Sequence, residues 1–390
     1  MLKVIARDGV SFKRFCGDDG DEEYQIVIVP PGHLTFEAQL HHVQAAYEDV
    51  QRSLGLDPGS AVFRRIFLSD ALNQVAVVKD SDLAANRRDN PVAVSIVQQP
   101  PLPGAKIALL AYHIDSRTPM TKTRLAARHV LVTRNGRRYL WSAGLGSHPS
   151  DPEPSAAEQT RAIFATLADM LRGLGGSLAQ NCMRTWIYLR NADVFYQGMV
   201  SARRELFESA GLTAETHYIA STGIEGGSPN RHDVVSMDAL SLLDLKPGQV
   251  SYLNDFDMLC ATKDYGVTFE RGTRIAFADR AHLYISGTAS IDYAGRVLHP
   301  GDVCRQLDRA IANVDALLRS GGAAREDMQH LIVYLRDASD YPRVSGMLRE
   351  SFPDVPTVVV HGPVCRPEWL VEIEGIAAVG RENNPVQPAF

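Results

Sequence analysis

The sequence predicts an α+β protein in which three similar units share one chain. One order of elements occurs twice, about 145 residues apart, and a fainter copy precedes both, which is the signature of internal repetition. In each copy, helical periodicity alternates with short β-branched runs. The 390 residues, of which 45% are hydrophobic, suffice for more than one buried core. We therefore expect mixed sheets with helices packed on one face.

The clearest copy occupies the last third of the chain. Apolar residues recur every three or four positions from Asp302 to Arg319, which predicts a helix with one apolar face. Gly321 and Gly322 follow, as glycine does where a helix ends in the left-handed conformation. The other elements expected here are strands at His282–Gly287, Leu331–Leu335, Thr357–Val360 and Trp369–Val379, and a helix at Tyr341–Phe352.

The two earlier copies show the same order with different loop lengths. In the second we expect strands at Arg138–Ala143 and Trp186–Arg190 and helices at Ala157–Leu174 and up to Phe207. In the first we expect a helix at Phe36–Leu54, a strand at Phe63–Leu68, and two strands within Pro91–Tyr112. These spacings predict units at 22–130, 131–240 and 265–380, with a linker at 241–264.

Composition narrows the class of function. The net charge of −6 comes without a basic stripe, which argues against nucleic-acid and anionic-membrane partners. The five cysteines are scattered and odd in number, and the twelve histidines show no metal-ligand spacing. No segment approaches the ~20 apolar residues of a membrane helix, and the first residues lack a signal core. We expect a soluble cytoplasmic protein without metal.

Two glutamates in the last predicted strand are candidates for acid–base chemistry. Glu372 and Glu374 lie on one side of a strand, because alternate residues share a face. Their apolar neighbours indicate a buried strand, where ionisation of a carboxyl group is disfavoured. The alternative, which the residues alone leave open, is that both point to solvent from a half-exposed strand.

Several segments carry a family resemblance. Tyr284-Ile-Ser-Gly-Thr288, Val333-Tyr-Leu-Arg-Asp337 and Leu370-Val-Glu-Ile-Glu-Gly-Ile-Ala377 resemble the YjgF/RidA/UK114 fold. The resemblance implies a mixed sheet with two helices on one face, and a trimer with clefts between its sheets. Three copies in one chain would make a covalent pseudo-trimer, which we expect to be a monomer.

Over about residues 22–379, the whole chain resembles the chorismatase family more specifically. The segments that carry this resemblance are Phe67–Asn73, Ala220–Ile224, Asp264–Gly266, Phe269–Gly272 and Val364–Arg366. It implies an enzyme of lyase or hydrolase type, in secondary metabolism, that takes chorismate as its substrate. Pyruvate is released, and a hydroxybenzoate or a cyclic diene diol is left, without metal or organic cofactor.

The resemblance also assigns roles to residues. It makes Glu372 the catalytic acid and base, with Glu374 as the fallback, which suits an enol ether that must be protonated on its vinyl carbon. It makes Cys365 a second catalytic residue, at a position that distinguishes hydroxybenzoate-forming members. The residues expected to bind substrate are Tyr196, Arg203, Ser221, Thr222, Tyr265, Arg271 and Ala289.

The ring product stays open at this point. Cys365 favours 3-hydroxybenzoate, whereas Ala289 leans toward hydrolysis to 3,4-dihydroxycyclohexa-1,5-diene carboxylate or toward mixed products. We favour 3-hydroxybenzoate because Cys365 keeps a fixed spacing of seven residues to Glu372, and we keep 4-hydroxybenzoate as a further alternative.

Two other functions compete with chorismate conversion. Small members of the fold are enamine/imine deaminases that hold a carboxylate with an arginine fifteen residues before the glutamate, where this chain has Thr357. A non-catalytic binding protein is the second rival, since one scaffold hosts several functions. We expect one working cleft, because Ile107 or Leu109 replaces the glutamates in the first unit.

Overall fold

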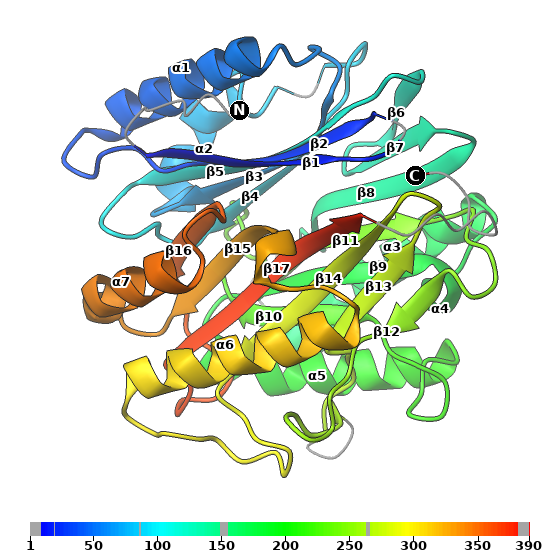
Figure 1. The fold of residues 1–390 in the computed structure, drawn as a ribbon, viewed down its shortest axis with the longest axis vertical. Coiled ribbons are helices and arrows are strands. Elements are labelled where there is room, and N and C mark those ends of the chain that lie inside the picture. The colour runs from blue at the N-terminus through cyan, green and yellow to red at the C-terminus, as the bar shows by residue number, and fades with distance from the viewer. Residues whose placement is uncertain (1–8, 19, 86, 149–154, 263–265, 381–389) are drawn as a thin grey trace.

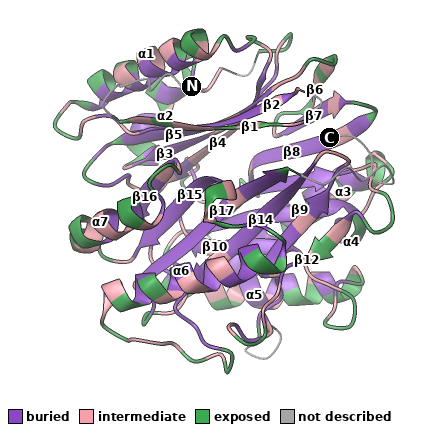
Figure 2. Ribbon diagram, in the orientation of Figure 1, coloured by how far each residue is buried: buried purple, intermediate pink, exposed green. Residues whose placement is uncertain are grey.

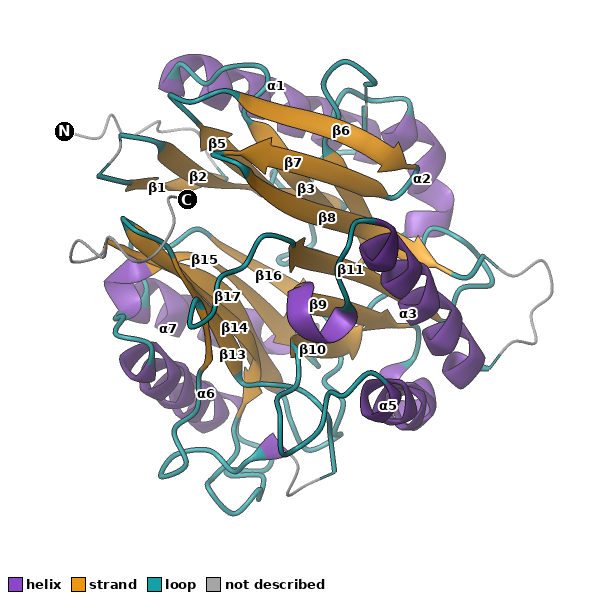
Figure 3. Cartoon of the chain, turned by 90° about the vertical axis from the view of Figure 1, so that its right-hand side faces the viewer, coloured by secondary structure: helices purple, strands orange, loops and turns teal. Residues whose placement is uncertain are grey.

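The computed structural model contains three mixed sheets, which confirms the predicted α+β architecture of three units (Figures 1 and 3). It describes residues 9–380 and 390, apart from 19, 86, 149–154 and 263–265. The helices lie on the outside, and the sheets face one another around the centre of the molecule. Within the described ranges, none of the helices has the length and apolar character needed to cross a membrane.

The first sheet has the strand order β1-β2-β5-β3-β4, with β3 and β4 parallel. Helix α1 covers its outer face, and α2 lies beside β4. The bounds are β1 Val10–Cys16, β2 Glu22–Ile28, α1 Phe36–Leu54, β3 Ala61–Leu68, α2 Ala71–Lys79, β4 Ala93–Gln98 and β5 Ile107–Asp115.

The second sheet has the order β10-β9-β11-β8-β7-β6, with β9 and β10 parallel. Its main helices, α3 and α5, pack against each other on the outer side. The bounds are β6 Met120–Ala126, β7 His129–Arg134, β8 Arg137–Gly146, α3 Ala156–Gly173, α4 Leu178–Asn181, β9 Cys182–Leu189, α5 Ala192–Ser209, β10 Ala220–Glu225 and β11 Val235–Leu242.

The third sheet has the order β12-β13-β14-β17-β15-β16, with β15 and β16 parallel. Helix α6 covers β14 and β17, and α7 packs beside it. The bounds are β12 Val250–Tyr252, β13 Gly272–Ala276, β14 Arg280–Ala289, α6 Val303–Ser320, β15 Met328–Leu335, α7 Tyr341–Ser351, β16 Thr357–His361 and β17 Val371–Gly380; short 3-10 turns span Arg325–Asp327 and Ala338–Asp340.

The signals at the helix ends act as the sequence predicts. The Asp302 side chain caps α6 by accepting a hydrogen bond from the backbone N–H of Arg305. After α6, Gly322 takes a φ of 73°, a left-handed conformation that glycine adopts without steric cost. The apolar stripe of α6, which includes Leu307 and Val314, is buried against the third sheet. This helix therefore fixes β14 and β17 from behind.

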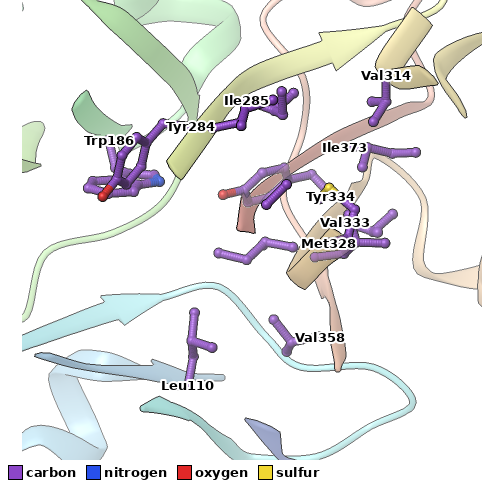
Figure 4. Packing of buried hydrophobic residues seen from close by; sticks show 14 of the residues in the cluster. Leu110, Trp186, Tyr284, Ile285, Val314, Met328, Val333, Tyr334, Val358 and Ile373 are labelled. Atoms are coloured by element: carbon purple, nitrogen blue, oxygen red, sulfur yellow. The ribbon is translucent and has the colours of Figure 1, made fainter. Parts of the chain in front are cut away.

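The largest hydrophobic core lies where the three sheets meet. Buried aromatic side chains from all three, among them Phe63, Trp186 and Tyr334, belong to one cluster. Figure 4 shows Leu110 of the first sheet, Trp186 of the second and Tyr334 of the third converging on this centre. The central strands β9, β11 and β15 are accordingly buried on both faces (Figure 2). The three units therefore share one interior.

The sheets divide the chain at places other than the expected boundaries. Strands β6 and β7 pair with β8 in the second sheet, although we expected the first unit to run from 22 to 130. Strand β12, inside the expected linker 241–264, joins the third sheet by pairing with β13, and β1 precedes residue 22. Strand β6 is largely exposed and polar, so it lacks the apolar run by which strands are recognised.

Candidate active site

A cavity lies between the second and third units and collects nearly all of the predicted site residues. Strands β10 and β14 approach each other there, and Ile224 of β10 forms a bridge with Val364. The empty space, mouth included, is about 560 Å³.

Glu372 lies on the wall of this cavity and is buried. It lies on β17, opposite Ala289 of β14 and Tyr334 of β15, and only 5% of its surface is exposed. A Cβ atom on Gly287 would come within 2.0 Å of Glu372 Oε1. Only glycine at position 287 leaves room for this carboxyl group. Glu374 is 1% exposed, so the alternative that both glutamates point to solvent is wrong.

The surroundings of Glu372 favour its neutral form. Burial raises its pKa to about 8, and the negative charge of neighbouring Glu374 acts in the same direction. The positive charges of Arg271 and Arg184 lower the pKa and only partly offset these two effects. Glu372 is therefore mainly a protonated carboxylic acid near neutral pH, a state in which a carboxyl group is able to donate a proton.

Glu374 faces the interior between the units and is held by three side chains. Its Oε2 accepts a hydrogen bond from Arg184 Nη2 at 2.5 Å and another from the hydroxyl of Thr222. Its Oε1 accepts one from the hydroxyl of Tyr334 at 2.9 Å. With both oxygens engaged by donors, Glu374 acts as a fixed carboxylate. It is thus poorly placed for the fallback role of acid.

Thr222 and Ser221 differ in what their hydroxyl groups can do. Thr222 Oγ1 donates to Glu374 and accepts from the backbone N–H of Gly287 at 2.9 Å and from Arg184 Nη2 at 2.6 Å. One hydroxyl has one donor and two acceptor positions, so this group is fully used. Thr222 therefore joins the two units and positions Gly287. Ser221 Oγ accepts a hydrogen bond from Thr185 Oγ1 at 2.9 Å and retains its own proton for a ligand.

Two buried guanidinium groups supply positive charge to the cavity. Arg203 of α5 is 1% exposed, and its Nε donates to Thr268 Oγ1 at 3.2 Å. Arg271 is 3% exposed, and its Nη2 donates to the carbonyl of Cys260 at 3.2 Å. Both arginines line the same cavity as Glu372. Planar guanidinium groups suit carboxylate ligands because they donate two parallel hydrogen bonds.

Cys365 lies beside Glu372 as a neutral thiol. Burial raises its pKa to about 12, the charge of Glu372 adds to this effect, and a hydrogen bond with Tyr196 opposes it. A thiol that stays protonated is a poor nucleophile. On the cavity wall, Cys365 is therefore a neutral group that forms a hydrogen bond with Tyr196.

Of the nine predicted site residues, eight line this cavity. They are Tyr196, Arg203, Ser221, Thr222, Arg271, Ala289, Cys365 and Glu372. Tyr265 lies outside the described residues. Sequence reasoning missed Gly223, Val267, Phe269, Gly287, Ile291, Arg366 and Trp369 in the lining, and Arg184 and Tyr334 behind it. Gly287 could have been found, because it lies in the segment Tyr284–Thr288 that resembles the YjgF/RidA fold. No local pattern marks Arg184 as the partner of Glu374, which lies 190 positions away.

The pairing of equivalent strands in the three sheets identifies the residues that correspond to Glu372 in the other units. Glu372 faces Tyr334 on the neighbouring strand, Ala108 faces Phe67, and Ser236 faces Tyr188. The counterpart in the first unit is therefore Ala108 rather than Ile107 or Leu109, because a slip of one residue moves a side chain to the opposite face. Neither Ala108 nor Ser236 can donate a proton as a carboxylic acid does.

The three sheets and their outer helices have the YjgF/RidA-like fold, with three units in one chain. Residues 274–379 match the family model described as Endoribonuclease L-PSP. A crystal structure titled Chorismatase matches with a TM-score of 0.63 at 18% identity, covering 82% of this chain and 93% of that one.

Sequence relatives narrow the class. The 3-hydroxybenzoate synthase of Streptomyces hygroscopicus is 28% identical over 254 residues, which span 58% of this chain and 71% of the relative. The Chorismatase of Streptomyces rapamycinicus is 29% identical over 250 residues, spanning 57% and 70%. A 3-aminoacrylate deaminase of Acinetobacter baylyi matches at 28% over 99 residues, which is 25% of this chain. Over these segments the chain is thus similar to proteins named 3-hydroxybenzoate synthase and Chorismatase, which supports a relationship to the chorismatase family.

The raised pKa of Glu372 predicts a pH-dependent stability. The unfolded chain ionises this group near 4.5 and the folded chain near 8, so between these values unfolding releases a proton. The free energy of unfolding therefore falls as pH rises through this window. We expect Glu372→Gln to remove up to about 3 kcal/mol of this loss at pH 7.

Urea unfolding at pH 4 and pH 7 measures this effect. From pH 4 to pH 7, the free energy of unfolding should fall less in Glu372→Gln than in the parent protein. An equal pH dependence in both proteins would show that Glu372 titrates normally.

Proposed function

We propose that the protein cleaves chorismate to pyruvate and a hydroxybenzoate, with 3-hydroxybenzoate as the favoured ring product. The observation that carries the proposal is a protonated, buried Glu372 in a cavity that also holds Arg203 and Arg271. Chorismate is a dianion with an enol ether, so it needs fixed cations for its carboxylates and an acid for its vinyl carbon. The names of the two Streptomyces relatives support this substrate.

In the proposed mechanism, Glu372 transfers its proton to the terminal vinyl carbon of the enol ether. The ether carbon becomes oxocarbenium-like, and when the bond between the ring carbon and the ether oxygen breaks, its electron pair stays on that oxygen, which becomes the carbonyl of pyruvate. Loss of the hydrogen from the hydroxyl-bearing ring carbon then leaves 4-hydroxybenzoate, whereas 3-hydroxybenzoate requires the neighbouring hydroxyl oxygen to bond to the carbon that loses pyruvate before that carbon gives up its hydrogen. In both cases the ring releases one proton as it becomes aromatic, and the carboxylate form of Glu372 takes up this proton, which restores the acid. Arg203 and Arg271 would bind the carboxylates, and Ser221 would donate its hydroxyl to one of them. The chain's own groups supply each of these steps.

Atom balance separates the possible products. Chorismate divides into pyruvate and a hydroxybenzoate without added atoms, whereas the diene diol requires one water molecule. We favour the hydroxybenzoate because Cys365 lies seven residues before Glu372 and lines the same cavity. We keep hydrolysis to 3,4-dihydroxycyclohexa-1,5-diene carboxylate and formation of 4-hydroxybenzoate as alternatives. The proposal includes a cytoplasmic, monomeric enzyme.

The arginine of the enamine/imine deaminases has no counterpart beside Glu372. Thr357, expected at that place, lies on β16 and lines a different cavity, between the third and first units. The matching position next to Glu372 is Ser221, because Ser221 faces Thr185 in the second sheet as Thr357 faces Leu331 in the third. Both residues are neutral, so neither supplies the ion pair of that mechanism.

A single assay distinguishes the candidate functions. Purified protein is incubated with chorismate, and pyruvate is measured with a coupled reductase while mass spectrometry identifies the ring product. Release of pyruvate with 3-hydroxybenzoate is the expected result. Pyruvate with the diene diol or 4-hydroxybenzoate would select an alternative product. Absence of pyruvate would reject the proposal, and ammonia release from an enamine substrate would favour the deaminase.

Cys365 is expected to control the ring product rather than the release of pyruvate. We predict that Cys365→Ala keeps pyruvate release within about tenfold of the parent, because the thiol does not protonate the enol ether, and shifts the ring product toward the diene diol. The measurement is the product ratio by mass spectrometry. Cys304→Ala, on α6 and away from the cavity lining, is the matched control. An unchanged ratio in Cys365→Ala would remove the role of the cysteine.

A further inference from the structure

The cleft between the first and second units holds a second cavity with its own chemistry. It is related to the Glu372 cavity by the repetition of the units, because Ser236 occupies the position of Glu372 in its sheet. The empty space, mouth included, is about 940 Å³. Its lining consists of Lys79, Ile96, Arg128, Gly144, His148, Ser228, Pro229, Asn230 and Ser236. None of these residues is acidic.

Two cationic side chains reach this cavity from opposite units. Lys79 lies in the last turn of α2, and Arg128 lies in the turn between β6 and β7. Within the part of the chain that the structure describes, neither side chain has a hydrogen-bond or ion-pair partner. Gly144 lets the guanidinium lie close to the backbone, since Arg128 Nη1 is 3.2 Å from where a Cβ atom would stand. Both charges therefore remain available to a ligand.

The carboxylates behind the lining are already occupied, since Asp238 accepts from the backbone N–H of Gly144 at 2.7 Å and pairs with buried Arg65. Asp233 accepts hydrogen bonds from the hydroxyl of Ser228 at 3.0 Å and from the backbone N–H of His148 at 2.9 Å. Its Oδ2 also lies 3.0 Å from His148 Nδ1, and its side chain is 0% exposed. Asp233 thus organises the His148 segment and leaves the charges of Lys79 and Arg128 without compensation.

The third cleft provides an internal comparison. Between the third and first units, a cavity is lined by Val27, Val29, Leu102 and Val359, among others, and no charged residue belongs to its lining. Of the three related cavities, one thus combines an acid with arginines, one has no charged residue in its lining, and one is cationic without an acid. The charge in the cleft with Lys79 and Arg128 is therefore not a property shared by every cleft of this fold.

We infer that the cleft between the first and second units binds a small organic carboxylate, held by Lys79 and Arg128, without transforming it. The guanidinium of Arg128 and the ammonium of Lys79 would share the carboxylate. The hydroxyl of Ser236 lies in the same lining as a further donor, and Ile96 offers an apolar surface to the hydrocarbon part. Because Ser236 replaces Glu372, the bound molecule meets no carboxylic acid.

Methyl NMR with labelled isoleucine tests this inference, because the two cavities carry separate reporters. Ile96 lines the cationic cavity, and Ile291 lines the Glu372 cavity. We expect benzoate to shift the Ile96 signal with saturation, at a dissociation constant of about 1 mM or below. In the double variant Lys79→Ala/Arg128→Ala, this dissociation constant should rise at least about tenfold, while the response of Ile291 stays unchanged.

The control is the double variant Lys246→Ala/Arg349→Ala, which removes the same charge from exposed positions outside the lining. It should bind benzoate at Ile96 like the parent protein. A lack of saturation at Ile96, or equal binding in both double variants, would overturn the inference. Pyruvate release from chorismate should be unchanged in Lys79→Ala/Arg128→Ala, so the result is independent of the proposed function.

Discussion

Glu372→Gln is expected to lower the rate of pyruvate release from chorismate by about 10²- to 10⁴-fold while the protein stays folded. Glutamine keeps the size of the side chain beside Gly287, where space is tightly limited, but it has no acidic proton to transfer. General acid catalysis contributes a factor of this size. Initial rates from the coupled pyruvate assay, with circular dichroism as the check of folding, provide the measurement.

Glu368→Gln is the matched control, since this exposed glutamate lies four residues earlier and outside the cavity lining. It should retain the parent rate. The parent rate should also decline as pH rises past about 8, because the pKa of Glu372 lies there and the carboxylate cannot donate a proton. Full activity in Glu372→Gln would refute the assignment of the acid.

Glu374→Ala is expected to cost about 3–5 kcal/mol in the free energy of unfolding. The change leaves the buried guanidinium of Arg184 and the hydroxyls of Thr222 and Tyr334 without their acceptor. Removal of one partner from a buried ion pair is more costly than the pair is worth, because an uncompensated charge remains inside. The loss should be visible as a lower urea midpoint with an unchanged slope.

Glu215→Ala, at an exposed position, should change the free energy of unfolding by no more than about 0.5 kcal/mol. A loss below about 1 kcal/mol in Glu374→Ala would mean that water or a rearranged side chain compensates Arg184. In that case the network around Glu374 would not hold the second and third units together.

Periodicity predicted the elements that bury an apolar face and missed those that do not. The helix expected at Phe36–Leu54 has these bounds in the structure, since its apolar stripe, Thr35 cap and terminal Gly55 agree. Strand β6 escaped prediction because its residues alternate between partly and fully exposed positions without an apolar run. Its place is set by pairing with β7, a tertiary interaction that a local pattern does not contain.

The candidate site divides in the same way. Glu372 and Cys365 could be predicted because they lie in one segment with a recognisable motif. The network behind them joins Arg184 and Thr222 of the second unit to Glu374 of the third, and no sequence spacing announces such a contact. The register error in the first unit, Ile107 or Leu109 for Ala108, had another cause. Ile107, Ala108 and Leu109 are all apolar and buried, so the pattern of residues does not show which of them faces Phe67; the pairing of β3 with β5 shows it.

Placement of the cavity between two units of one chain affects how the site assembles. In a trimer of separate subunits, a site shared by two subunits is lost on dilution, because its formation depends on protein concentration. Here Arg203 and Glu372 come from different units but from the same polypeptide, so the encounter of the two walls is intramolecular. Catalytic activity per molecule should thus be constant down to the lowest enzyme concentration at which turnover is measurable.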